Sequence, residues 1–117
     1  MRHARDLVQE LKELAWAAGL FEANGSATRQ KRRPVRLQLK MTARESVLRF
    51  RDAVDLGTVY GPYEHIYKDG HARRPYYLWL ADGDQAEEVA AALQPHLSQH
   101  VIEKIRAAIR DQNRGRP

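Results

Sequence analysis

The sequence contains no cysteine, and this absence excludes disulfide bonds and metal sites built on thiolates. No run of about 18 apolar residues occurs, so the signal of a membrane-spanning helix is missing as well. The chain starts with Arg2, His3 and Arg5 and continues into a charged amphipathic segment, unlike a secretory signal peptide. Together these absences predict a cytoplasmic protein without a membrane partner.

Acidic residues are in deficit. The 117 residues include 20 Lys and Arg against 15 Asp and Glu, which gives a formal net charge of +5. This balance favours a polyanionic partner. Arginine, which greatly outnumbers lysine, suits bidentate contacts to phosphate and guanine. The length predicts one domain, which we place at residues 1–113, with residues 114–117 as a frayed tail.

A helical pattern opens the chain. Leu7, Leu11 and Leu14 recur at helical spacing over residues 4–14 and predict a helix that runs into, or bends at, residues 14–26. This second segment is rich in small residues, which let two helix backbones approach closely; they are Ala15, Ala17, Ala18, Gly19 and Ala23. Gly25 is expected to end the helix through a left-handed turn.

Strict alternation of polar and apolar side chains follows over residues 26–42, on both sides of a basic turn at residues 32–34. This pattern predicts a hairpin with one face in a core. Residues 43–57 predict a helix, with Thr42 as its N-cap, Glu45 completing a capping box and Gly57 as its stop.

A second hairpin is expected over residues 58–80, with its turn at Asp69-Gly70 and a bulge or an edge at Gly61-Pro62. The register of its second strand stays open, because apolar side chains occur at every position from 76 to 80. Two helices follow, at residues 85–94 with Asp84 as N-cap and at residues 99–112, separated by a break at Pro95.

One face of the first hairpin is polar and basic. Between Thr28 and Lys40 the chain carries six basic side chains and no acid, whereas the predicted helices mix both signs. A curved antiparallel ribbon fits the major groove of double-stranded DNA, where Arg and Lys can bind guanine and Gln can bind adenine. The side chains expected to contact DNA are Ser26, Thr28, Gln30, Arg32, Arg36, Gln38, Lys40 and Thr42.

Residues 17–25, Ala-Ala-Gly-Leu-Phe-Glu-Ala-Asn-Gly, resemble the LAGLIDADG motif of homing endonucleases, and Trp16 and Ser26 resemble its bacterial and phage branch. The order of elements resembles a single-motif unit of this family over nearly the whole chain. The resemblance implies an α+β fold of αββαββα order, in which helices cover one face of a four-stranded antiparallel saddle-shaped sheet. It also implies a bacterial or phage protein that is associated with the nucleoid when bound to DNA.

In this family a single motif implies a homodimer on palindromic or pseudo-palindromic DNA. The resemblance places the two-fold interface on the motif helix, at Ala15, Ala18, Gly19 and Glu22.

The resemblance further implies an acidic residue at the end of each motif helix that binds Mg²⁺ at a DNA phosphate. That catalytic-acid position holds Asn24, an amide that keeps the shape of the acid and loses its charge. The backbone carbonyl of Ala23 is a candidate for one further metal ligand. The basic residue that the family often places near the scissile phosphate is best matched by His100, although a surface histidine is equally expected there. Met41 stands where a polar side chain is expected near the metal.

Three functions remain open. The first is a sequence-specific, metal-dependent DNA endonuclease of homing-endonuclease type that Asn24 leaves inactive or crippled. The second is a DNA-binding regulator that uses the same scaffold without cleaving. The third is a small interaction module with an incidental basic surface, which a steep salt dependence of DNA binding would exclude.

Overall fold

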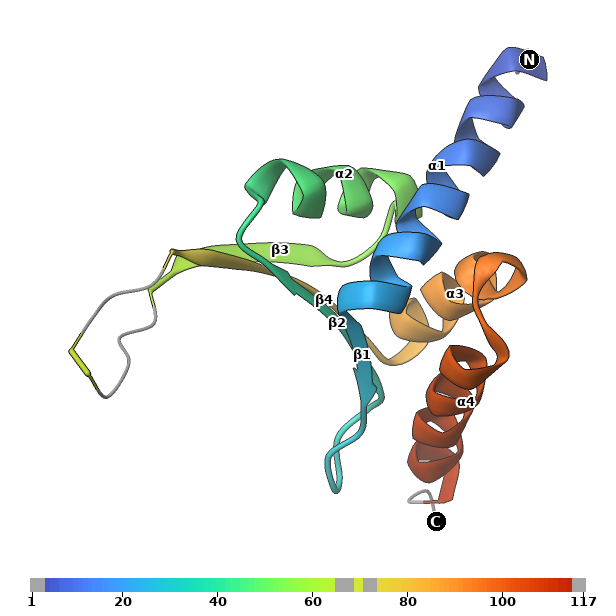
Figure 1. Ribbon diagram of the computed structural model, residues 1–117. Helices are drawn as coiled ribbons and strands as arrows, with labels where there is room; N and C mark the ends of the chain where they lie inside the picture. The colour runs from blue at the N-terminus through green and yellow to red at the C-terminus, as the bar shows by residue number, and fades with distance from the viewer. Residues whose placement is uncertain (1–3, 65–68, 71–73, 115–117) are drawn as a thin grey trace.

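A computed structural model of the chain describes residues 4–64, 69–70 and 74–114. Its helices are α1 (Ala4–Asn24), α2 (Arg44–Val54), α3 (Gly83–Leu93) and α4 (Gln99–Arg114), with a 3-10 turn η1 (Gln94–His96) between the last two. Its strands are β1 (Gly25–Thr28), β2 (Arg36–Met41), β3 (Thr58–Tyr63) and β4 (Tyr76–Asp82). The predicted order of helix, hairpin, helix, hairpin, helix and helix is confirmed (Figure 1).

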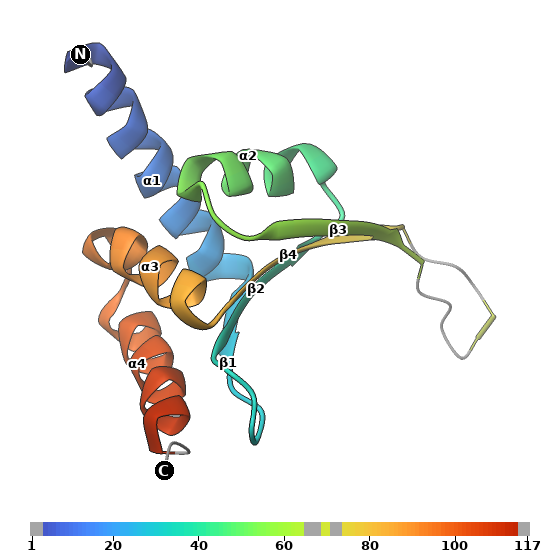
Figure 2. The same cartoon turned by 180° about the vertical axis from the view of Figure 1, so that it is seen from behind.

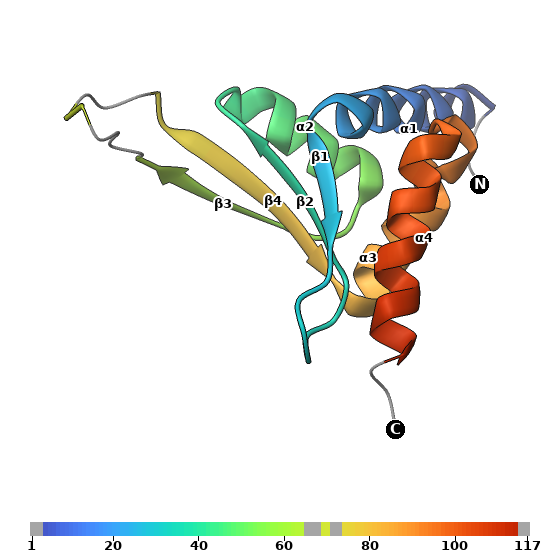
Figure 3. The same ribbon diagram turned by 60° about the horizontal axis from the view of Figure 1, so that its bottom comes forward.

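The four strands form one antiparallel sheet in the order β1-β2-β4-β3, and the sheet is strongly curved (Figures 1 and 2). Leu37, Leu39 and Trp79 alternate with more exposed residues and are completely buried against the helices. Seen from below, the other face carries none of the helices that the structure describes (Figure 3). The predicted α+β fold, with helices on one face of a four-stranded antiparallel sheet, is therefore confirmed.

Aromatic rings join the motif helix to the sheet. The Phe50 ring of α2 lies 6.4 Å from the Phe21 ring of α1, between centroids, and 4.7 Å from the Trp79 ring of β4 in an edge-to-face contact. The indole Nε1–H of Trp79 donates a hydrogen bond of 2.8 Å to the carbonyl oxygen of Leu56. These contacts bury large apolar surfaces and satisfy the one polar atom of the indole.

Helix α1 is a continuous helix of 21 residues, so the first predicted helix runs into the motif segment. Its N-terminal half projects beyond the other elements (Figure 1). Leu7, Val8 and Leu11 are therefore 47%, 50% and 59% exposed, and the apolar stripe expected from the sequence packs only from Leu14 onwards.

Gly25 has a different role from the one predicted. It does not have a positive φ, so α1 does not end through a left-handed glycine. A Cβ atom at this position would lie 2.6 Å from Cγ of Phe21, well inside van der Waals contact. The glycine is required because the Phe21 ring packs against the backbone where α1 turns into β1.

The predicted helix caps are wrong in detail. Helix α2 has Ala43 as its N-cap without a side-chain hydrogen bond, rather than Thr42, and it ends at Val54 with Asp55 in the left-handed conformation. Helix α3 has Asp82 as its N-cap, also without a side-chain bond, rather than Asp84. Packing of the apolar faces positions these helices, and the capping side chains do not.

The second hairpin pairs as predicted. Strand β3 is an edge strand, and its pairing with β4 shifts register between Tyr60 and Tyr63, as Gly61-Pro62 indicated. The strand ends at Tyr63, and residues 65–68, which were expected to continue it, lie outside the described part. Arg114, expected in a frayed tail, is the last residue of α4, and residues 115–117 are also outside that part.

Among the described residues, the helices are all too short or too polar to cross a bilayer.

Candidate nucleic-acid interface

The open face of the sheet, which no helix covers, brings polar side chains of β1 and β2 together. Ser26 pairs with Gln38 and Thr28 pairs with Arg36 across the two strands. Together with the exposed Lys40, they alternate with the buried Leu37 and Leu39. These five predicted DNA-contacting residues therefore share one face of the sheet.

Three other predicted contact residues do not lie on strands. Strand β1 ends at Thr28, and Gln30 accepts a 3.0 Å hydrogen bond from the backbone N–H of Arg33 in the following turn. Arg32 lies in this turn with a φ of 65°. Thr42 follows the end of β2. The turn ends the alternation that the sequence pattern extended to residue 32, so Gln30 and Arg32 belong to the tip of the hairpin.

An acidic side chain faces Arg36 from β4. Nε of Arg36 donates to Oδ1 of Asp82 at 2.7 Å, and Nη2 donates to Oδ2 at 3.1 Å. The hydrogen bonds to Asp82 raise the pKa of Arg36 above its ordinary value. The polar face is therefore less uniformly basic than residues 28–40 suggested, because Asp82 joins it from a distant part of the sequence.

The register of β4 is settled by Trp79 and Ala81, which are buried. Leu78 and Leu80 consequently lie on the open face, where they pair with Lys40 and Gln38. The ammonium of Lys40 lies 4.1 Å from the centre of the Tyr76 ring, within cation–π distance. The open face thus combines a polar half on β1 and β2 with a half on β3 and β4 that is apolar and aromatic except for Asp82 at the end of β4.

The end of α1 carries Ala23 and Asn24, the two residues that the sequence resemblance places in a catalytic metal site. Ala23 and Asn24 are exposed in its last turn. The carboxylate of Glu22 accepts a hydrogen bond from the backbone N–H of Ser98, immediately before α4. Two contacts from Ser98, and more weakly the charge of His100, lower the pKa of Glu22.

Glu22 should make the free energy of unfolding depend on pH in the acidic range. Because its pKa is lower in the folded state than its ordinary 4.5, its stabilising contribution is present above about pH 5 and is lost as the pH falls through the folded pKa. Glu22→Gln should therefore flatten the fall in unfolding free energy between about pH 5 and pH 2. Denaturant titrations at several pH values measure this.

The matched control is Glu13→Gln. The pKa of Glu13 is lowered by its hydrogen bonds to Arg49, 2.7 and 2.9 Å long, so it titrates in the same direction at another place. Each variant should remove its own share of the acid dependence, and the double variant should remove both. An acid dependence unchanged by Glu22→Gln would show that the contact with Ser98 contributes nothing.

The donor atoms at the end of α1 do not fit Mg²⁺ well. Mg²⁺ prefers anionic oxygen atoms, but Asn24 is neutral and the Glu22 carboxylate is already bound to a backbone N–H. Ala23 offers only a carbonyl. No group of three or more His, Cys, Asp or Glu side chains is arranged for a metal within residues 4–64, 69–70 and 74–114.

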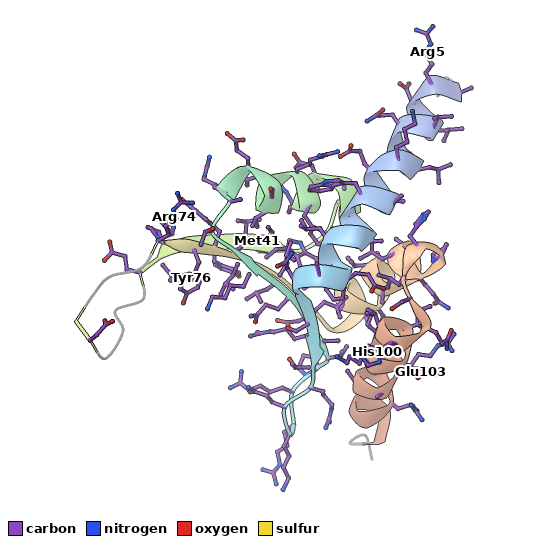
Figure 4. The ribbon with its side chains drawn as sticks, viewed as in Figure 1. Arg5, Met41, Arg74, Tyr76, His100 and Glu103 are labelled. Carbon is purple, nitrogen blue, oxygen red and sulfur yellow. The ribbon has the colours of Figure 1, made fainter. Side chains whose placement is uncertain are left out.

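The structure separates the remaining candidate residues. His100 is exposed on α4, on the side of α1 away from Tyr76 and Arg74, which lie toward the far end of the sheet (Figure 4). Met41 is partly buried against the core and does not present a polar group to the site. Of these residues, only His100 lies close enough to Glu22 to influence its pKa.

The four predicted interface residues of α1 differ in exposure. Ala15, Gly19 and Glu22 are exposed, and a Cβ atom at Gly19 would meet nothing within 4 Å. Ala18 is completely buried in the core of its own chain, so its side chain is not accessible to a second chain in this structure. The helical period of 3.6 turns Ala18 towards the sheet and Gly19 away from it.

Sequence reasoning missed three residues on the open face of the sheet, Asp82, Leu78 and Leu80, and one residue, Ser98, that binds Glu22 at the end of α1. Asp82 lies beyond residues 58–80, over which the second hairpin was expected, and the two leucines could not be assigned to a face. Asp82 could have been found as the residue that pairs with Arg36 across the two strands. Identifying that pair requires the register of β4, and this register is set by the tertiary packing of Trp79.

Comparison with known proteins relates this fold to a family. Neither a protein-family model nor a curated protein sequence matches the chain. Among solved structures, the homing endonuclease I-CvuI bound to its target (Sro1.3) with Ca superposes with a TM-score of 0.64 and 17% identity, over 91% of this chain and 69% of that chain. I-CvuI bound to the I-CreI target with Mg and uncleaved DNA gives a TM-score of 0.66 and 18% identity, over 92% and 69%.

The archaeal intron-encoded homing endonuclease I-Vdi141I, complexed with DNA, gives a TM-score of 0.52 and 12% identity, over 93% of this chain and 86% of that chain. All three neighbours share the arrangement described above, and the resemblance that residues 17–25 suggested is confirmed at the level of the fold. The chain has the fold of the LAGLIDADG homing endonucleases.

Proposed function

We propose that this chain binds double-stranded DNA sequence-specifically through the open face of its sheet, as a homodimer on a palindromic or pseudo-palindromic site. The observation that carries the proposal is the shared surface of Ser26, Thr28, Arg36, Gln38 and Lys40, which no helix covers. Side chains of these types bind base edges and phosphates in the major groove. The nucleoid of a bacterial or phage-infected cell is the corresponding location.

The scaffold supports an endonuclease origin, because the neighbours of this fold are homing endonucleases described with DNA and with Ca or Mg. Phosphodiester hydrolysis in such a site needs a metal that polarises the phosphate and activates water. With Asn24 in the position of the acid, this chain cleaves DNA poorly or not at all. Cleavage is therefore the part of the function that the amide at position 24 disables, and binding is retained.

A non-cleaving DNA-binding regulator is the second candidate, and one observation favours it. The one carboxylate in the last turn of α1, that of Glu22, is bound to the N–H of Ser98. A hydrogen bond at the start of α4 gives this residue a structural role that needs no metal. A regulator that does not cleave DNA needs no catalytic acid at position 24, so Asn24 is compatible with that function.

DNA binding is tested by the salt dependence of affinity for a duplex selected from a randomised library. The logarithm of the association constant should fall with the logarithm of salt concentration, with a slope of about −0.9 for each phosphate contacted. Changing Lys31, Arg32 and Arg33 to Ser should reduce the steepness by up to about three units, because these residues form the basic tip of the hairpin.

The charge-matched control changes Arg51, Lys104 and Arg106 to Ser, all three exposed on helices. It should leave most of the slope intact. Binding that is weak and insensitive to salt, or equal losses in both triple variants, would leave only the interaction module among the three functions considered.

The homodimer rests on the exposed stripe of α1. Val8, Leu11, Ala15 and Gly19 follow one another along the helix at intervals of three and four residues, and all four are exposed. Such a spacing places them on one side of the helix. The stripe is apolar at its start and nearly flat at Gly19, which allows a second α1 to approach closely.

Gly19→Leu should weaken dimerisation and leave the folded chain intact. A side chain at position 19 meets nothing within 4 Å in its own chain, and leucine is a better helix former than glycine. At a helix crossing, however, its bulk should weaken the dimer by about 1–3 kcal/mol, roughly five- to 150-fold in the dissociation constant. Sedimentation equilibrium measures the association.

Ala91→Leu is the control, since it adds bulk at an exposed position of α3 that lines a hollow with residues of α4. It should not change the association. A parent chain that stays monomeric at micromolar concentration, with and without DNA, would rule out the homodimer.

A further inference from the structure

We propose that Asp82 positions Arg36 to read a guanine, so that the two residues form one recognition unit on the open face. The inference rests on the DNA binding proposed above and names a specificity determinant for it. The side chain of Asp82 is 45% exposed and that of Arg36 is 43% exposed, so both are accessible from the side of the sheet that no described helix covers.

The geometry divides the guanidinium between two partners. Arg36 presents the edge formed by Nε and Nη2 to the two carboxylate oxygens, at 2.7 and 3.1 Å. A guanidinium is planar and carries five N–H groups in a fixed fork. The edge formed by Nη1 and Nη2 points away from Asp82, and it has the spacing that matches O6 and N7 of guanine in the major groove.

The backbones of the two residues are fixed relative to each other. Arg36 and Asp82 are paired across β2 and β4. The next residue, Gly83, donates its N–H to the carbonyl oxygen of Val35 at 2.9 Å, and its φ of 58° lets α3 start immediately after the strand. Because Asp82 makes no side-chain cap to α3, its carboxylate is directed to Arg36 and has no competing structural duty there.

The pair borders a polar hollow of about 180 Å³ on the open face, which is also lined by Thr28, Arg33 and Gln38. The side chains of Thr28, Arg33, Arg36 and Gln38 can donate to the edge of a base or to a phosphate, whereas the carboxylate of Asp82 only accepts. An arginine that is already held in one conformation loses less side-chain freedom when it binds a base.

Asp82 should also lower the affinity of the chain for DNA, and this effect makes the proposal testable. Its negative charge opposes binding to any phosphate backbone, whatever the base sequence. Removing the charge should therefore raise non-specific affinity, whereas releasing Arg36 should lower the preference for guanine. A residue that merely stabilised the fold would not move these two quantities in opposite directions.

The experiment uses the full chain and a duplex selected by the parent, together with a duplex of scrambled sequence. Each guanine of the selected half-site is replaced in turn by 7-deazaguanine, which lacks the N7 acceptor, or by adenine. The variants are Asp82→Asn, Arg36→Lys and the control Asp84→Asn. Asparagine is also a good N-cap, so Asp82→Asn should retain α3.

For the parent, one guanine position should be sensitive, with a loss of about 5- to 150-fold on replacement by adenine. Asp82→Asn and Arg36→Lys should both remove most of this discrimination at the same position. Asp82→Asn should bind the scrambled duplex more tightly than the parent. Asp84→Asn, which makes the same charge change at another exposed acid, should keep full discrimination.

Two results would overturn the inference while leaving the proposed function standing. One is full guanine discrimination in Asp82→Asn together with its loss in Arg36→Lys, which would mean that Arg36 reads the base unaided. The other is stronger discrimination in Asp82→Asn, which would make Asp82 a competitor of the base. If the parent selects no duplex, the proposed DNA binding itself fails.

Discussion

Asn24→Asp should give this chain Mg²⁺-dependent DNA cleavage, raising the rate on the selected duplex by at least about a hundredfold. The residue lies exposed at the end of α1, where a carboxylate can be added without burying a charge. In a dimer built on α1, two such carboxylates would supply the anionic oxygens that the present residues lack. Cleavage is measured on supercoiled and linear DNA that carries the selected site.

Three further variants make this result specific. Asn24→Glu tests a longer carboxylate, and Asn24→Ser removes the amide without adding charge and should stay inactive. Mg²⁺ should also raise the melting temperature of the Asn24→Asp complex with DNA, and should not do so for the parent. This second readout reports metal binding even where turnover is slow.

The opposite outcome has an equally definite meaning. If parent, Asn24→Asp and Asn24→Glu all bind the duplex and none cuts it, the scaffold is that of a DNA reader. Met41, which is partly buried, and Glu22, which binds the N–H of Ser98, would then be features of a site that no longer supports hydrolysis. The regulator would replace the endonuclease as the function.

Much of this fold could be predicted from the sequence because local pattern and tertiary packing agree. The clean alternation around Leu37 and Leu39 allows only one face to be buried, and the structure buries that face. The continuous helical spacing before Gly25 likewise leads to one long helix. The strand alternation and the helical spacing both assign apolar side chains to the same core. Any other arrangement of these segments would expose those side chains to water.

The less predictable parts depend on contacts between distant residues. In β4 both faces are apolar, so only the fit of Trp79 against Phe50 and Leu56 chooses between them. That choice puts Asp82 beside Arg36, a pairing separated by 46 residues in the chain. The caps at Thr42 and Asp84 were wrong for a related reason, because tertiary packing displaced weak local preferences.

The candidate site shows the same division. Ser26, Thr28, Arg36, Gln38 and Lys40 could be grouped by parity alone, since successive strand residues alternate in direction. Parity could not foresee that β1 ends at Thr28, nor that the helical rotation of α1 buries Ala18 and exposes its neighbour.

Gly57→Ala should destabilise the fold by about 2–5 kcal/mol, the largest loss we expect from adding a single methyl group. Gly57 has a φ of 90°, which is unfavourable for any residue with a side chain. The added Cβ would also lie 2.8 Å from the carbonyl oxygen of Leu80 and 2.7 Å from Cε2 of Trp79. Neither atom can move away easily, because one is backbone and the other belongs to a completely buried ring. Urea denaturation of the variant and the parent measures the difference.

Asp55→Gly is the matched control, because it removes a side chain at a positive φ two residues earlier, whereas Gly57→Ala adds one. Asp55 already has a φ of 57°, so glycine should be neutral there or stabilise by up to about 1 kcal/mol. If Gly57→Ala cost no more than Asp55→Gly, the indole of Trp79 would have room to shift, and Gly57 would be only a flexible connection. A large loss of unfolding free energy in Gly57→Ala alone would show instead that the atoms packed around Trp79 cannot shift. Since the burial of Trp79 fixes the register of β4, the same substitution should then weaken the pairing of Asp82 with Arg36 and reduce discrimination between DNA sequences.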